Sequence, residues 1–175
     1  MSSIEEITGQ VRALTTGVER AQSLTAAADR QAQGVAARAA GGGFTAVAAG
    51  MAQVRAAIAA IRGGLGRVAS AVGEAITATG RVPREATPQE SISALAPVGQ
   101  GITGAREAAT ATIGHVDQAR HLVGAVLHGG QPGPLLQALD SVKQVLVLLV
   151  QGGTNAQQTV EAAISQARQL GSAGN

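Results

Sequence analysis

The chain has 175 residues and a mass of 17.3 kDa, a size that suits one domain or two small repeats with a common core. Only 1% of its residues are aromatic, which argues against sites that stack rings on bases, sugars or quaternary ammonium groups. The absence of cysteine excludes disulfides, thiolate metal sites, iron–sulfur clusters and a cysteine nucleophile. Thirteen basic and eleven acidic side chains give a net charge of +2, and because the basic ones are not clustered, they do not predict a nucleic-acid surface.

The first residues contain no basic segment followed by an apolar one, so we expect no secretory signal peptide. The longest apolar run extends from Val145 to Val150, far short of the roughly 20 residues that a transmembrane helix needs. We therefore expect a cytoplasmic protein without a transmembrane segment. Export would require a route that does not depend on a signal peptide.

Apolar side chains recur at alternating steps of three and four residues near the N-terminus, which predicts a helix over about 3–40. Ser2 and Ser3, with Glu5 and Glu6 three residues later, form an N-capping pattern. The triple glycine at 41–43 predicts the end of this helix. The predicted buried stripe consists of Ile4, Ile7, Val11, Leu14, Val18, Ala21, Thr25, Ala28, Ala32, Val35 and Ala39.

The same spacing predicts a second helix over about 45–80. Its stripe stays in phase through Gly63 and Gly64, so we expect one continuous helix and not two short ones. The stripe consists of Val47, Met51, Val54, Ile58, Ile61, Leu65, Val68, Val72 and Ile76.

A shift of 88 positions aligns the two halves of the chain without a gap. It places Asp29 on Asp117, and the double glycine at 41–42 on that at 129–130. We infer a tandem duplication of a helical hairpin. Residues 1–80 form the first hairpin, 81–90 a connector and 91–175 the second hairpin, with helices over about 91–128 and 134–171.

The connector contains two prolines and loses the apolar periodicity. Thr87, Pro88 and Glu90 suit the cap and first turn of a new helix. Pro97 then predicts a kink or a late start in the third helix, because proline cannot donate a helical hydrogen bond. Pro132, Gly133 and Pro134 predict the second hairpin turn.

A single hairpin would leave its apolar stripes exposed, so the two hairpins are expected to share one core. The predicted fold is all-α, an antiparallel four-helix bundle or coiled coil. The fourth helix is apolar on most sides from 135 to 150, which predicts that it is central or covered by something else. Phe44 is predicted either to plug the first turn or to contact a partner. The candidate partner-binding residues are Phe44, Val145, Leu146, Leu148, Leu149 and Val150.

No residue pattern indicates catalysis. His115, His121 and His128 are six and seven residues apart, whereas zinc-binding pairs on a helix prefer spacings of three or four. The glycine groups are not followed by Gly-Lys-Ser/Thr, as a phosphate-binding loop requires. We therefore expect no enzyme activity, no catalytic residues, no cofactor and no metal site.

Long alanine-rich hairpins with a glycine turn and an excess of Arg over Lys resemble the actinobacterial W-x-G proteins of type VII secretion, and other Ala/Gly-rich helical proteins of those bacteria. The family's W-x-G turn would fall near 43–45, where this chain has Gly-Phe-Thr, and its Tyr-x-x-x-Asp/Glu export motif is absent because the chain has no Tyr. In that family two hairpins pair as a dimer, and the resemblance implies a similar pairing within this chain.

Two functions are consistent with these observations. The first is a non-enzymatic protein–protein interaction or structural bundle, with a protein partner or a second copy of the chain, and a role associated with secretion is one form of it. The alternative is a surface-active coat similar to the granule-associated phasins, whose amphipathic helices lie on lipid or polymer granules. No nucleic-acid partner is expected.

Overall fold

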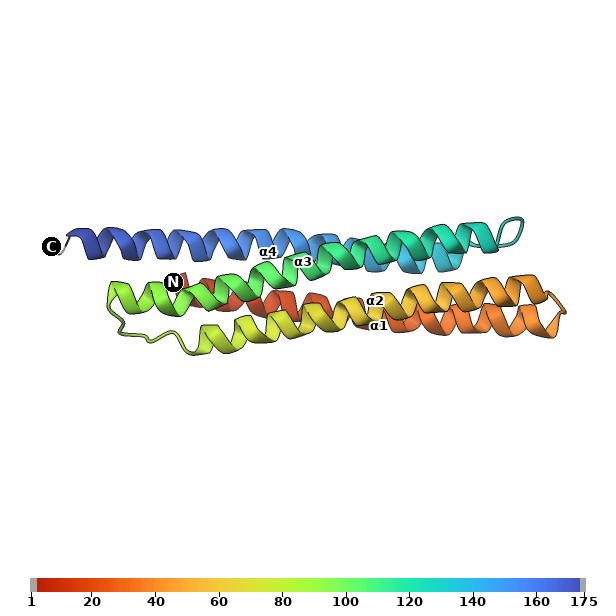
Figure 1. Cartoon of the computed structure of the whole chain (residues 1–175), viewed down its shortest axis with the longest axis horizontal. Coiled ribbons are helices and arrows are strands. Elements are labelled where there is room, and N and C mark those ends of the chain that lie inside the picture. The colour runs from red at the N-terminus through yellow and green to blue at the C-terminus, as the bar shows by residue number, and fades with distance from the viewer. Residues whose placement is uncertain (1–2, 174–175) are drawn as a thin grey trace.

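A computed structural model describes residues 3–173 and shows four long helices (Figure 1). They are α1 (Ser3–Gly41), α2 (Thr45–Gly80), α3 (Pro88–Val126) and α4 (Gly133–Ala173). No strand occurs within this range. The all-α prediction is confirmed. Ser2, one of the predicted caps of the first helix, lies outside the described residues.

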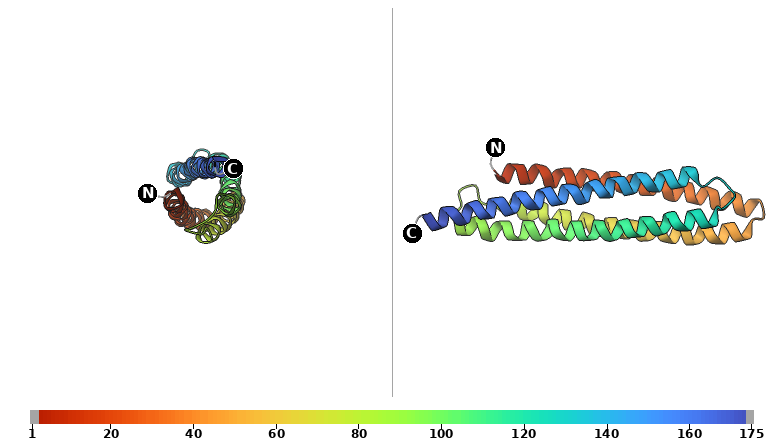
Figure 2. Two further views of the ribbon diagram at one scale, coloured as in Figure 1. Left: turned by 90° about the vertical axis from the view of Figure 1, so that its left-hand side faces the viewer. Right: turned by 90° about the horizontal axis from the view of Figure 1, so that it is seen from above.

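The four helices form an up-and-down bundle in which consecutive helices are antiparallel (Figures 1 and 2). Each helix packs on the two that adjoin it around the ring, in the order α1, α2, α3, α4 and back to α1. The end-on view in Figure 2 shows this ring arrangement. Because α4 is one of four equivalent members, the prediction that it is central is wrong, and one of its sides faces solvent.

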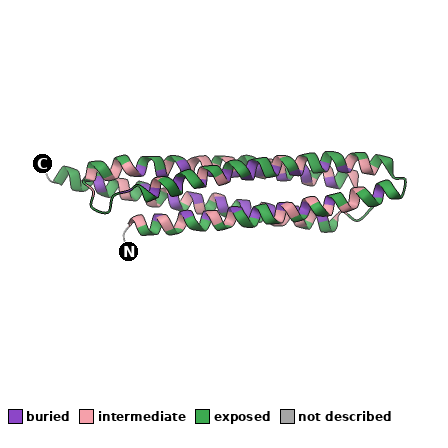
Figure 3. Cartoon of the chain, turned by 90° about the horizontal axis from the view of Figure 1, so that it is seen from below, coloured by how far each residue is buried: buried purple, intermediate pink, exposed green. Residues whose placement is uncertain are grey.

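Buried side chains from all four helices form one continuous core, visible as the inward stripes in Figure 3. The predicted stripe of α1 is confirmed from Ile7 to Ala32, and Thr25 in its gap is buried with its hydroxyl donating to the Ala21 carbonyl at 2.7 Å. In α2 the helix continues through Gly63 and Gly64 as predicted.

The end of the α2 stripe differs from the prediction. Ile76 is 41% exposed, while Ala75 and Thr79 are buried instead. The buried positions from Met51 to Val72 alternate in steps of three and four residues, and Ala75 and Thr79 continue this alternation. Ile76 lies one residue beyond it, at the edge of the buried stripe.

The start of α3 at Pro88 contradicts the predicted late start near Pro97, which lies inside the helix. A capping box holds the first turn: the Thr87 hydroxyl accepts from the Glu90 amide, and the Glu90 carboxylate accepts from the Thr87 amide at 2.8 Å. Pro97 removes a hydrogen bond to the Ser93 carbonyl, but both residues are exposed, so water can solvate that carbonyl.

Each hairpin turn contains one glycine whose backbone is in the left-handed conformation. Gly43 has a φ of 79° and Gly129 a φ of 85°, values that other residues rarely adopt. The first turn carries Phe44, whose ring lies against Gly42 but is 65% exposed. The prediction that Phe44 plugs the turn is therefore wrong.

The two hairpins contact each other through α2 and α3 and through α1 and α4, and the helices of these two pairs are packed differently. At the α2–α3 contact, a Cβ on Gly101 would lie 2.9 Å from the Ala75 amide nitrogen, and a Cβ on Gly64 would overlap Thr112. Glycine at these positions thus allows the two backbones to approach closely. At the α1–α4 contact, large side chains such as Leu149 fill the space between the helices.

The hairpins are also displaced along the bundle relative to an exact two-fold arrangement. In such an arrangement Gly152 of α4 would face Leu24, the residue 88 positions before Thr112, but it faces Leu14. Figure 1 shows the same displacement, because the first turn extends beyond the second at one end and α4 extends beyond α1 at the other. The first turn, which carries the exposed Phe44, therefore extends past the second turn.

Equivalent ion pairs cross each hairpin. The Asp29 carboxylate pairs with Arg55 at 3.2 Å, and the Asp117 carboxylate pairs with Lys143 at 2.7 Å. The two pairs are related by the same shift of 88 positions. They support the predicted duplication, which stays a prediction.

The close α2–α3 contact predicts opposite effects for two alanine substitutions in α3. Gly101→Ala should lower the free energy of unfolding by about 1–3 kcal/mol, because the new methyl group would meet the Ala75 backbone. Gly114→Ala should raise it by up to about 1 kcal/mol, because Gly114 has open space around it and alanine favours helix. Urea denaturation measures both, and equal effects would contradict the close contact.

The capping box predicts a pH dependence. The amide and hydroxyl of Thr87 donate to Glu90 and lower the pKa of its carboxyl group. Thr87→Ala should therefore raise the Glu90 pKa and lower the melting temperature at pH 7. Because a lowered pKa stabilises the fold only while the group is ionised, the part of this difference that depends on Glu90 should disappear as the pH falls below about 4. NMR titration of the Glu90 carboxyl carbon and thermal unfolding at each pH test this, and an unchanged pKa in the variant would refute it.

Candidate functional site

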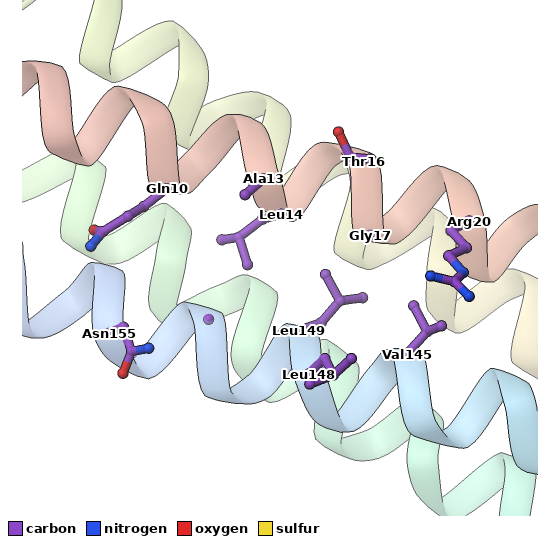
Figure 4. A pocket seen from close by; sticks show the side chains of 11 residues that line it. Gln10, Ala13, Leu14, Thr16, Gly17, Arg20, Val145, Leu148, Leu149 and Asn155 are labelled. Carbon is purple, nitrogen blue, oxygen red and sulfur yellow. The ribbon is translucent and has the colours of Figure 1, made fainter.

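A groove of about 310 Å³ runs between α1 and α4 near the middle of the bundle (Figure 4). Successive turns of α1 and α4 form its walls, so the groove is made by segments that are far apart in the sequence. The lining residues are Gln10, Ala13, Leu14, Thr16, Gly17 and Arg20 of α1, and Val145, Leu148, Leu149, Gly152 and Asn155 of α4.

Two glycines give the groove its shape. A Cβ on Gly17 would lie 2.6 Å from Cδ2 of Leu149, and a Cβ on Gly152 would lie 3.2 Å from Cδ2 of Leu14. Each glycine therefore accepts a leucine from the opposite helix, and these two leucines form the apolar floor. Because the glycines themselves add no side chain, the surface above the floor stays open.

Polar groups mark the two ends of the groove, as Figure 4 shows. At one end Gln10 donates through Nε2 to the Thr159 hydroxyl at 3.1 Å, while its Oε1 is buried and has no hydrogen-bond partner in the described part of the chain. At the other end the Arg20 guanidinium has neither an ion pair nor a hydrogen bond within residues 3–173. The site thus offers one unused acceptor, one unused cation and an apolar floor between them.

The face around the groove is poor in charge. Residues 144–160 of α4 contain no charged side chain. By contrast, Arg120 of α3 pairs with Asp140 of α4 at 2.8 Å, and the Asp29–Arg55 pair joins α1 to α2. Depletion of charge is typical of the centre of protein interfaces.

The structure divides the predicted partner-binding residues. Leu148 is 63% exposed on the rim of the groove, Phe44 is exposed at the far turn, and Val150 is half-buried. Leu146 is fully buried in the core and lines no groove wall, whereas Val145 and Leu149 are mostly buried but line the groove, so their role in partner binding stays a prediction. All three pack into the core because they lie on the side of α4 that faces the bundle.

The neighbouring Val147 is 37% exposed and extends the apolar surface beside Leu148. Sequence reasoning did not single out Gln10, Arg20 or the two glycines. No sequence signal identifies them, because they meet only when α1 and α4 pack at this particular register. Gly17 looks like an ordinary helical glycine until Leu149 is placed opposite it.

The three histidines do not form a site. His115 is half-buried in α3, while His121 and His128 are exposed. Asp117, four residues before His121, pairs with Lys143 and Arg120. Among residues 3–173, no group of three or more His, Cys, Asp or Glu side chains is arranged to hold a metal ion.

Helix α4 is long and apolar enough to meet the composition criteria for a membrane span. Core helices of bundles meet the same criteria, so this observation is weak evidence. The helix packs against both α1 and α3 in the structure.

Residues 86–172 match the sequence profile of a family of unknown function (DUF6244). The match spans the end of the connector, α3 and nearly all of α4, and it leaves out the first hairpin. No curated protein matches the chain significantly.

The exposure of neighbouring leucines predicts opposite outcomes for two alanine substitutions in α4. Leu146→Ala should lower the free energy of unfolding by about 2–5 kcal/mol, because it leaves a cavity in the core. Leu148→Ala should change it by no more than about 0.5 kcal/mol. Urea denaturation of both variants is the measurement, and a large loss of stability in Leu148→Ala would show that the groove is closed in solution.

Proposed function

We propose that this chain is a non-enzymatic helical bundle that binds another polypeptide through the face formed by α1 and α4. The observation that carries this proposal is Leu148, a large apolar side chain that is 63% exposed beside an apolar groove. Exposing it to water forgoes about 2 kcal/mol of burial energy, which contact with a partner would recover.

The surroundings of Leu148 support a polypeptide as the ligand. The α4 side of the face has no charged side chain between residues 144 and 160, and small side chains line part of the groove, so a partner helix can approach closely and meets one charged lining residue, Arg20. Two polar groups at the ends of the groove supply directional contacts, which fix the orientation of the partner.

A role in secretion is a finer form of the same proposal. It is supported by the resemblance of the long hairpins and glycine turns to the W-x-G proteins. The coat function is the second candidate, and the apolar composition of α4 favours it. In a coat, the hairpins would have to separate at the close α2–α3 contact before their core faces could reach a lipid or polymer surface.

Photo-crosslinking in the cells that make the protein tests the proposal. With a benzophenone amino acid at position 148, ultraviolet light should produce adducts with a polypeptide, either another copy of the chain or a different protein. The same amino acid at Ser70, an exposed position on α2, is the matched control and should give few adducts.

Equal yields at positions 148 and 70, or none at either, would refute a polypeptide ligand on this face. Adducts with lipid at both positions would instead favour the coat function.

A further inference from the structure

We propose that the end of the first hairpin is a second binding surface, which attaches the bundle end-on to a lipid membrane of negative charge. This basic end consists of residues 30–55, which are the last turns of α1, the first hairpin turn and the first turns of α2. It is separate from the α1–α4 groove, so the inference goes beyond the proposed function. It is carried by an exposed aromatic ring at the end of the bundle and by exposed arginines behind that ring.

The charges of the basic end all have one sign. Residues 30–55 contain three arginines, which are all exposed, and no acidic residue. Asp29, at the border of this segment, pairs with Arg55 at 3.2 Å. Arg30 and Arg38 have no ion pair within residues 3–173. Two positive charges are therefore available to an anionic ligand.

The rest of the bundle carries no comparable excess of one sign. Near the second turn, Asp117 pairs with Lys143 and Asp140 pairs with Arg120. The opposite end of the bundle, where the chain begins and the connector lies, mixes both signs (Figure 1). Because only one end is basic, the field of an anionic surface orients the bundle with that end forward. The exposed charged residues of the opposite end include Glu5, Glu6, Arg81, Arg84, Glu85 and Glu90.

The hairpin fold does not require these groups. The shift of 88 positions that relates the two hairpins places Gln118 and Val126 at the positions of the two unpaired arginines. The same shift places Pro132 at the position of Phe44. The second hairpin forms two long helices without the ring and without these charges. The ring and the arginines are therefore surface features of the first hairpin, as expected of groups that bind a ligand.

Phe44 gives the basic end an apolar tip. It is the one aromatic residue of the chain and is 65% exposed, on a turn that extends past the second turn (Figure 1). Apart from Phe44, residues 40–48 are Ala, Gly, Val and a single Thr, so few polar side chains surround the ring. A tip with few directional groups suits a fluid lipid surface better than a protein pocket, because aromatic and apolar side chains enter the membrane interface without specific partners.

The spacing between the ring and the arginines matches the layers of a membrane. Arg38 lies three positions before Gly41, the last residue of α1, or about 5 Å along the helix axis. The headgroup layer of one leaflet is about 5–8 Å thick. A ring at the edge of the hydrocarbon therefore places the Arg38 guanidinium among the headgroup phosphates. Arg30 and Arg55 lie about 15 Å further from the turn, so their attraction to the surface depends strongly on salt.

Co-flotation of the purified full chain with lipid vesicles tests the attachment. The chain should bind vesicles made of equal amounts of phosphatidylglycerol and phosphatidylcholine, at lipid concentrations of about 1–5 mM. It should not bind vesicles of phosphatidylcholine alone. Binding to the anionic vesicles should fall at least tenfold, as an order of magnitude, between about 50 mM and about 500 mM salt.

Two pairs of variants locate the surface. Phe44→Ala should weaken binding by at least about threefold, whereas Leu148→Ala, which removes an exposed apolar side chain elsewhere, should leave it unchanged. The double variant Arg30→Gln and Arg38→Gln should weaken binding by about tenfold without a loss of helix content. The double variant Arg81→Gln and Arg84→Gln removes the same net charge from the opposite end and is the matched control. Equal losses in the two double variants would overturn the proposal.

Spin labels test the orientation, because the chain has no natural cysteine that would also be labelled. On vesicle binding, a label at Thr45→Cys, beside the ring, should become shielded from a relaxation agent that is dissolved in the water. Labels at the exposed positions Ser70→Cys and Leu148→Cys should stay accessible to the agent. Equal shielding at all three positions would indicate a coat that lies flat on the lipid and would overturn the end-on attachment.

The remaining outcomes also decide the inference. A chain that leaves the anionic vesicles unbound at low salt would overturn it. If that chain instead binds soluble polyglutamate, and the double variant Arg30→Gln and Arg38→Gln loses this binding, the basic end is a site for an acidic polypeptide and not for lipid. Crosslinking at position 148 reports on the α1–α4 face alone, so this inference and the proposed function can fail independently.

Discussion

The close packing of α2 against α3 is the constraint on which the rest of the bundle depends. Glycines at this contact bring the two backbones together where any side chain would collide, as Gly101 shows against Ala75. Each hairpin has its own internal register, marked by the Asp29–Arg55 and Asp117–Lys143 pairs. Once α2 and α3 are locked in register, the positions of α1 and α4 follow. The register of the α1–α4 contact is therefore set by the α1–α2, α2–α3 and α3–α4 contacts.

The displacement of the hairpins explains why the bundle has one distinctive face. In an exactly two-fold molecule, the α1–α4 contact would repeat the close α2–α3 contact and leave no groove. The shift instead places Gly17 opposite Leu149 and Gly152 opposite Leu14. The packing of these leucines against the glycines holds α1 and α4 together but leaves an open channel above the leucines. The same shift exposes Phe44 at the end of the molecule.

The chemistry of this face suits recognition more than reaction. Its polar groups are an amide oxygen and a guanidinium at opposite ends of an apolar floor. Groups so far apart cannot act on one bond, but they can orient a long ligand. The similarity of residues 86–172 to a family of unknown function covers the α4 wall of the groove and not its α1 wall. The complete groove therefore needs both hairpins.

The sequence by itself determined the four helices, most of their buried stripes and the two glycine turns, because local periodicity and backbone preference decide these features. It identified Thr87, Pro88 and Glu90 as the cap and first turn of α3, although the predicted helix began at about 91, and the late start predicted near Pro97 was wrong because the exposure of Pro97 could not be known from the sequence. Tertiary structure alone decided that Leu146 is core and Leu148 is surface, since both belong to one apolar run. It also created the groove, because the pairing of Gly17 with Leu149 depends on how two helices distant in sequence slide past each other.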